Sequence, residues 1–156
     1  MNTFAYLVDW ESDGKFESKI ATEDIISYGV IKTNNDATTT FCLPDNTFDY
    51  PSNLNETIES EFGKKTYDHT YGGTICSMCS GIFTYISEES AKHKASFANF
   101  AYGCDYFKAV KCVIPKGTTF YDASAVYKGD ADEDMWNPTD RYIGYLSDKI
   151  IIKEVI

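Results

Sequence analysis

The sequence predicts an α+β domain, with a mixed, mostly antiparallel sheet, one main helix and one or two short helices. Segments rich in β-branched and aromatic residues recur along the 156-residue chain, and turn residues separate them. Residues 87–102 instead carry apolar residues at helical spacing. The chain is 43% hydrophobic and 15% aromatic, which supplies enough apolar surface for the core of one domain over residues 1–156.

The N-terminal third is expected to contribute a hairpin, a short helix and a further strand. Residues 3–10 form the first strand, and residues 16–20 are expected to pair back on it. A threonine cap followed by two acids predicts a short helix over residues 22–29. Residues 34–36 then form a turn, and residues 38–43 form a strand of β-branched character.

The next segment is polar and is expected to hold little regular structure. Residues 44–55 contain two prolines, three asparagines and two aspartates, which predict a surface loop. Residues 57–62 predict one helical turn. Residues 63–73 predict a second loop, with a short strand at its start.

A strand, a helix and a second strand follow, and this unit organises the predicted fold. Residues 75–86 are mostly apolar and form a buried strand, with a break at Ser80-Gly81. Ser87 is a good N-cap, two glutamates occupy the first turn, and Gly103 is the C-terminal stop of the helix. Residues 106–114 form the second strand, and a Pro-Lys-Gly turn ends it.

Two faces of the predicted helix are apolar. Small residues dominate the first face, which is expected to lie against the sheet, and aromatic residues dominate the second. The first face holds Ala91, Ala95, Ala98 and Tyr102, and the second holds His93, Phe97 and Phe100. A helix that is apolar on two faces is expected to lie between layers or under a loop, with His93 in a packing role.

The C-terminal third is expected to complete the sheet. Strands are predicted at residues 118–121, 125–127, 141–146 and 149–156. The last strand contains three consecutive isoleucines, which predicts a central strand covered on both sides.

An acidic loop at residues 129–138 is the first candidate for binding a partner. It holds Asp130, Asp132, Glu133, Asp134 and Trp136. An exposed tryptophan ringed by acids suits a partner-binding loop, in which the ring anchors and the acids steer. In the alternative interpretation, Trp136 folds back over the core and the acids are merely solvated.

Charge and cysteine content narrow the class of partner and the compartment. Asp and Glu number 24 against 14 Lys and Arg, for a net charge of −10. Such a chain is not expected to bind free nucleic acid, whereas it suits a protein with a basic surface. In the alternative interpretation, the negative charge only keeps a small domain in solution. No apolar stretch is long enough for a membrane span, no signal peptide is apparent, and five cysteines is an odd number. We therefore expect reduced thiols and a cytoplasmic protein.

Cys76 and Cys79 have the spacing of half a zinc site. Four ligands are needed, and the residues that remain to complete the set are His69, His93, Cys104 and Cys112, none of them paired at the usual spacing. Buried reduced thiols are therefore the preferred interpretation, and no metal is expected. A redox pair is disfavoured as well, because an apolar strand rather than a helix N-terminus follows the first cysteine.

Three short motifs resemble a pattern in small phage and bacterial proteins of unknown function. Gly-Ile-Phe-Thr-Tyr-Ile-Ser at residues 81–87 leads into the alanine-bearing helix, Val-Ile-Pro-Lys-Gly stands at residues 113–117, and Ser-Asp-Lys-Ile-Ile-Ile stands at residues 147–152. The resemblance extends over residues 63–156. It implies a phage-encoded protein that acts in the cytoplasm of the host.

The same order of elements is more distantly similar to ADP-ribosyltransferase-like folds. In those enzymes an acidic residue near the last strands orients the NAD ribose, and a histidine or arginine in an early strand holds NAD. This chain departs from that pattern, because Arg141 is its only arginine and Ser147-Asp148-Lys149 stands at the expected Glu-x-Glu position. The resemblance therefore bears on fold more than on activity. If it extends to a ligand, it implies contacts from His69, Tyr85, Ser87, Asp148 and Glu154.

Three functional hypotheses follow. The first is a small acidic cytoplasmic protein that binds and modulates a host protein, in the manner of an inhibitor or an anti-defence protein; no cofactor is expected for it. The second is an ADP-ribosyltransferase-like, NAD-using enzyme or its inactive relative. The third is a zinc-stabilised structural module. The net charge of −10 and the lack of an assembled catalytic set favour the first.

Overall fold

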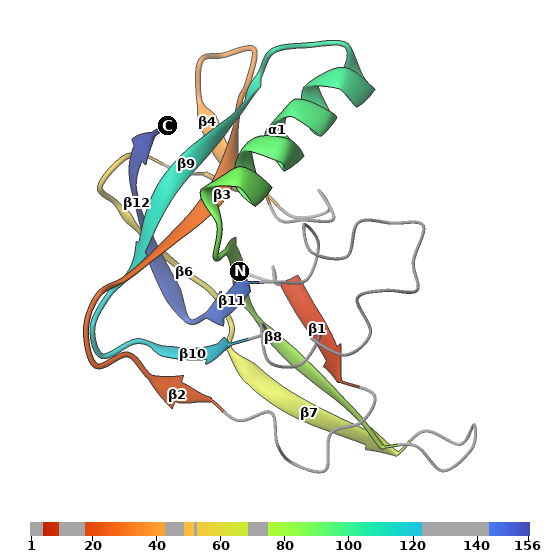
Figure 1. The fold of residues 1–156 in the computed structure, drawn as a ribbon, viewed down its shortest axis with the longest axis vertical. Coiled ribbons are helices and arrows are strands. Elements are labelled where there is room, and N and C mark those ends of the chain that lie inside the picture. Colours follow the sequence, from red (N-terminus) through yellow and green to blue (C-terminus); the bar gives the residue numbers. More distant parts are fainter. Residues whose placement is uncertain (1–4, 10–17, 43–48, 52, 69–74, 123–143) are drawn as a thin grey trace.

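The computed structural model describes residues 5–9, 18–42, 49–51, 53–68, 75–122 and 144–156, and within them the chain forms one helix and twelve strands (Figure 1). The strands are β1 (Ala5–Asp9), β2 (Lys19–Ile20), β3 (Ile25–Thr33), β4 (Thr39–Cys42), β5 (Asp49–Pro51), β6 (Thr57–Glu59), β7 (Gly63–Asp68), β8 (Ile75–Tyr85), β9 (Phe107–Ile114), β10 (Thr119–Asp122), β11 (Gly144–Ser147) and β12 (Lys149–Val155), and the helix is α1 (Glu88–Tyr102). The predicted antiparallel sheet with one main helix is confirmed. Every described strand pair is antiparallel, so the mixed character expected of the sheet is not found in this part of the chain.

The longest ladder of the sheet joins β3 to β9. Eight residue pairs run from Ile25–Ile114 to Lys32–Phe107. Residues that are directly paired share a face of the sheet, and successive residues alternate between the two faces. Ile31, Val110 and Cys112 therefore belong to one face, which we call the inner face, and Val30 and Ala109 belong to the other, which we call the outer face. All five side chains are buried, so the middle of the ladder is covered on both sides.

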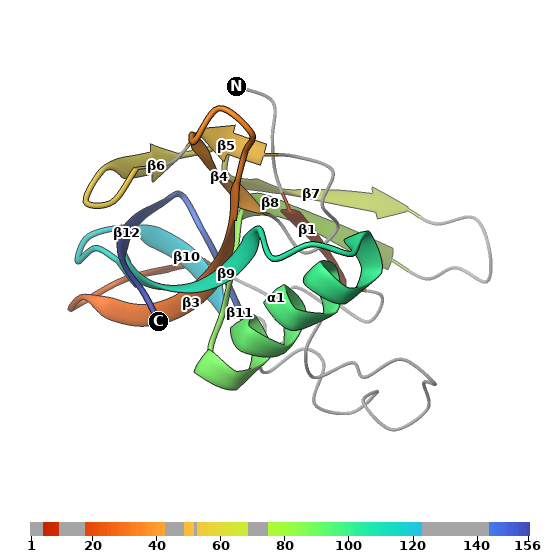
Figure 2. The ribbon, with the colours of Figure 1, turned by 90° about the horizontal axis from the view of Figure 1, so that it is seen from above.

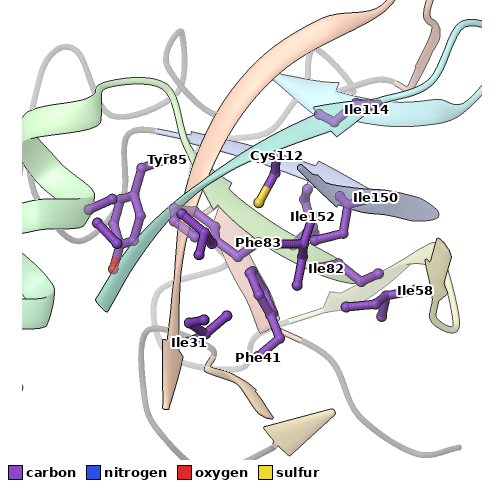
Figure 3. Close-up of a cluster of buried hydrophobic side chains, with 14 of the residues drawn as sticks. Ile31, Phe41, Ile58, Ile82, Phe83, Tyr85, Cys112, Ile114, Ile150 and Ile152 are labelled. Carbon is purple, nitrogen blue, oxygen red and sulfur yellow. The ribbon is translucent and has the colours of Figure 1, made fainter. Parts of the chain in front are cut away.

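The sheet curls around its inner face. Its main path runs β2-β10-β11-β8-β3-β9-β12-β6, yet β12 also contacts β8, although β3 and β9 lie between them in that order. One core cluster gathers side chains from both ends of the path, including Ile58 of β6, Ile82 of β8, Leu146 of β11 and Ile152 of β12. Figure 3 shows Ile58, Ile82 and Ile152 of this cluster close to Phe41 and Phe83. Burial of this apolar cluster holds the curled sheet together.

β8 belongs to two groups of strands. Its first part, up to Gly81, pairs with β1 on one side and β7 on the other, and its last four residues pair with β11 from Ile82 onward. A Cβ atom on Gly81 would lie 2.9 Å from the carbonyl oxygen of Ser147 in β11. The strand is continuous through Ser80-Gly81, where a break was predicted, and the glycine instead marks the place at which β11 comes close.

The helix α1 covers the outer face of β3 and β9. Figure 2 shows α1 on one side of β9, with β5 and β6 on the opposite side. The side chain of Ser87 accepts the backbone N–H of Ser90 as the N-cap, and Gly103 ends the helix in the left-handed conformation at φ 62°. Ala91, Ala95 and Ala98 are buried, so the predicted alanine face is confirmed as the packed one. Tyr102, which was assigned to the same face, is exposed.

The predicted helix at residues 22–29 is wrong, because Ile25–Thr33 is strand β3. Ser27, Gly29 and Ile31 are buried on the inner face at the two-residue spacing of a strand. Asp24, expected in the first turn of a helix, instead accepts the backbone N–H of Lys116 at 2.9 Å. The acid thus fixes the turn between β9 and β10.

Other segments also depart from expectation through pairing between distant parts of the chain. Residues 57–62 hold β6 rather than a helical turn, and Asp49–Pro51 in the predicted loop is β5. β2 pairs with β10 rather than with the first strand. β12 has a strand on each side, but its residues alternate in burial, so the double coverage predicted for it is not found. The predicted strand at residues 125–127 lies outside the described residues.

Two predicted turns are confirmed, at residues 34–36 and 115–117. Three predicted strands are confirmed as well, and their bounds in the structure are Thr39–Cys42, Ile75–Tyr85 and Phe107–Ile114. None of the helical residues that the structure describes forms a segment long and apolar enough to span a membrane.

We predict that Gly29→Ala destabilises the fold by about 1–3 kcal/mol. A Cβ atom at this position would overlap the ring of Phe41, 2.7 Å from its Cζ, and Phe41 is fully buried. Gly63→Ala is the control, because a Cβ atom on Gly63 would meet nothing within 4 Å. Chemical denaturation measures both unfolding free energies. Equal stability of the two variants would show that β4 can shift away from β3 at little cost.

Candidate functional site

The face of α1 that points away from the sheet carries two exposed phenylalanines. Phe97 is 58% exposed and Phe100 is 86% exposed, and they lie one helical turn apart. His93, one turn earlier on the same side, is also exposed. We call these three residues the outer stripe of α1. The expected position between layers or under a loop is not found in the described part of the chain, where both phenylalanines are exposed.

Three contacts fix α1 on the sheet and so fix the outer stripe. The buried alanine face lies against β3 and β9, where small side chains allow a close approach. The Ser87 cap holds the first turn. At the other end, Tyr102 stacks on Phe107 of β9 with ring centroids 5.7 Å apart. These contacts define the position of the stripe relative to the sheet.

The side chain of Asn99 adds a fourth contact, between the last turn of α1 and the start of β9. Its Nδ2 donates to the carbonyl oxygen of Phe107 at 2.9 Å, and its Oδ1 accepts the N–H of Phe107, also at 2.9 Å. On its other side Phe107 faces Lys32 of β3, while the described pairs of β12 with β9 begin only at Val110. The carboxamide therefore satisfies backbone groups that a neighbouring strand would otherwise have to satisfy.

Charged residues flank the outer stripe. Glu88 and Glu89 occupy the first turn of α1, and Lys92 Nζ lies 3.8 Å from Glu88 Oε2. The last turn contains no basic residue, and Asp105 follows it as an exposed acid. The C-terminal end of α1 therefore keeps the negative potential of the helix dipole.

The predicted acidic binding loop is not part of the described structure. Asp130, Asp132, Glu133, Asp134 and Trp136 all lie outside the described residues. Both interpretations of Trp136 therefore stay open.

The residues implied by the ADP-ribosyltransferase resemblance are spread over the fold. Tyr85 is buried at the end of β8, and the hydroxyl of Ser87 is the N-cap of α1. Asp148 follows β11, whose register places Gly144 beside Tyr85 and Ser147 beside Ile82, so Tyr85 and Asp148 lie at opposite ends of that strand. Glu154 on β12 forms an ion pair with Lys111 at 3.9 Å. His69 lies outside the described residues.

The cysteines fall into two groups. Cys76 and Cys79 lie in the first part of β8, residues 75–80, for which the structure describes only the backbone. Cys42, Cys104 and Cys112 are not joined in disulfides. Among the residues that the structure describes, no three His, Cys, Asp or Glu side chains gather as a metal ion requires. Burial raises the pKa of the Cys112 thiol to about 12.

Comparison of the chain with family models, curated proteins and solved structures found no match. The resemblances to small phage proteins and to ADP-ribosyltransferase-like folds therefore stay predictions.

Sequence reasoning found the outer stripe but missed its exposure and the role of Asn99. The spacing of His93, Phe97 and Phe100 on one face is a local signal, and the structure bears it out. The Asn99 contact joins two elements across the helix end, and its only local sign is a polar residue four positions before the terminal Gly103.

We predict that Asn99→Asp destabilises the protein by about 1–3 kcal/mol. The change removes the donor to the carbonyl oxygen of Phe107 and brings a carboxylate against that oxygen. Ser96→Asp on the exposed side of the same helix adds the same charge without touching β9, and it is expected to cost less than about 0.5 kcal/mol. Thermal and chemical denaturation compare them. If the two variants are equally stable, the carboxamide contact contributes nothing.

We also predict that iodoacetamide at pH 8 modifies Cys104 in the folded protein well before Cys42 and Cys112. Cys104 is partly exposed, the other two are buried, and the raised pKa keeps Cys112 in its unreactive thiol form. Peptide mass spectrometry measures the three rates. All three are expected to react alike in denaturant, and fast labelling of Cys112 in the native state would contradict its burial.

Proposed function

We propose that this protein acts by binding another protein, with the outer stripe of α1 in the contact. The observation that carries the proposal is the exposure of Phe97 and Phe100 on a helix whose opposite face is packed against the sheet. Phenylalanine side chains are costly to leave in water, and an aromatic anchor is a common centre of a binding surface.

The spacing of the stripe suggests how the partner is held. His93, Phe97 and Phe100 follow one another at intervals of four and three residues, which places their side chains in a row along the helix. A helix that presents anchors at this spacing docks into an apolar groove of its partner. The partner is therefore proposed to supply a groove that takes the two rings.

The packing of α1 on the sheet supports the same proposal. A surface that is already ordered before binding loses less conformational entropy when a partner docks. The alanine face, the Ser87 cap and the Asn99 contact hold the helix in place, so the two phenylalanines are presented in a fixed geometry.

The charge of the chain suggests the character of the partner. With a net charge of −10, the protein is attracted at long range to a basic protein surface, which increases the rate of encounter. The motif resemblance to small phage proteins suggests a setting, namely a host cytoplasm in which the chain modulates a host protein. We include no cofactor in this proposal.

The test is binding to a partner captured from host-cell lysate and then purified. We predict that Phe97→Ser combined with Phe100→Ser weakens the affinity by about 30-fold or more, because anchor residues carry most of the binding energy. Both side chains are exposed, so the melting temperature is expected to stay near that of the parent. Ile20→Ser is the control, since it removes a 67% exposed apolar side chain from β2, far from α1.

Two results would overturn the proposal. The double variant could bind the partner with the affinity of the parent while the Ile20→Ser variant loses binding, in which case the contact lies elsewhere. Alternatively, millimolar NAD could raise the melting temperature of the parent protein, and this result would favour the transferase hypothesis instead.

A further inference from the structure

An open hollow of about 190 Å³ lies at the end of the β3–β9 ladder, on the inner face of the sheet. Four apolar and four polar side chains line it. They are Ile31, Leu54, Ile152 and Val155 on the apolar side, and Thr33, Thr39, Asn53 and Lys108 on the polar side. No residue of α1 contributes, so the hollow is separate from the outer stripe.

The floor of the hollow is the end of the hydrophobic core. Ile31 and Ile152 are both buried members of the main core cluster. Above them, Leu54 is 50% exposed and Val155 is 46% exposed. Apolar side chains thus continue from the core to the surface through the hollow, and a ligand with an apolar body would cover them.

A tight turn holds one wall in place. The N–H of Asn55 donates to the carbonyl oxygen of Ile152 at 2.7 Å, and Asn55 adopts the left-handed conformation at φ 67°. The side chain of Asn53 donates to Glu56 at 3.1 Å. These bonds fix the turn on β12 and set Leu54 beside the hollow, so this wall exists before any ligand arrives.

Among the described residues of the lining, Lys108 alone is charged. It is directly paired with Ile31 in the β3–β9 ladder, so both belong to the inner face. Within the described part of the chain no ion pair to Lys108 is found, whereas Lys111 on the same strand is paired with Glu154. The hollow therefore offers a positive charge next to an apolar floor, in a protein that is otherwise strongly acidic.

We propose that this hollow binds a small organic carboxylate, with its apolar body on Ile31 and Ile152 and its carboxylate toward Lys108. The size agrees, because a cavity of about 150 Å³ is enough to hold benzene. A cation beside apolar surface selects an anion over a neutral or cationic molecule of the same shape. The threonine hydroxyls and the Asn53 amide at the rim supply further hydrogen-bonding groups.

The experiment is a titration of the full chain with benzoate and hexanoate at constant ionic strength, followed through backbone amide shifts in NMR spectra. Saturable shifts are expected at Ile31, Leu54, Lys108 and Val155. Benzamide and benzylamine, which are the neutral and cationic counterparts of benzoate, are expected to bind at least about tenfold more weakly, which corresponds to the loss of one charge-assisted contact.

Lys108→Gln is expected to weaken benzoate binding by about tenfold and to remove the preference for benzoate over benzamide. Lys111→Gln is the matched control, because it removes the same charge from the same strand on the opposite face. Leu54→Ser tests the apolar wall without touching the charge, and it is expected to weaken benzoate and benzamide alike.

Shifts that do not saturate, or that appear equally with benzylamine, would overturn the proposal. So would a Lys108→Gln variant that binds benzoate as the parent does, or a Lys111→Gln variant that loses binding to the same extent. None of these results bears on the outer stripe of α1, which the titration does not involve.

Discussion

The antiparallel ladder between β3 and β9 is the contact on which the rest of the structure depends. It is the longest strand pairing in the described fold, and it joins residues that are more than 70 positions apart in sequence. The ladder is stable because both of its faces are covered, one by the curled sheet and the other by α1. The fit is close at Gly29, where the ring of Phe41 occupies the space that a side chain would need.

This dependence explains which parts of the fold could be predicted from the sequence. Features governed by neighbouring residues were found, among them the Ser87 cap, the Gly103 stop and the turns at 34–36 and 115–117. The helix predicted at residues 22–29 was wrong because a distant part of the chain determines the structure there. A threonine followed by two acids is typical of a helix start, but residues from Ile25 onward pair with β9 and form a strand. Asp24 accepts a hydrogen bond from the backbone N–H of Lys116, which is distant in sequence. A local preference is weak beside a ladder buried on both faces.

The same reasoning applies to the two candidate surfaces. The outer stripe of α1 could be predicted as a row of residues, because helical spacing alone defines it. Whether the row is covered depends on other segments, so its exposure could not be predicted. The hollow could not be predicted at all, because its lining comes from β3, β4, β9, β12 and the turn before β6, and no local pattern marks such a set.

Two neighbouring residues of β9 each contribute to one of the two candidate surfaces. Phe107 belongs to the outer face, where it receives both hydrogen bonds of Asn99 and the stacked ring of Tyr102. Lys108, the next residue, belongs to the inner face and lines the hollow. Successive residues of a strand point to opposite faces, so the start of β9 fixes α1 with one residue and supplies the charge of the hollow with the next. Lys108 therefore lies directly beside the residue that anchors the C-terminal end of α1. The same alternation on β3 places Val30 against the alanine face of α1 and Ile31 in the lining of the hollow, so both strands of the ladder join the two surfaces through neighbouring residues.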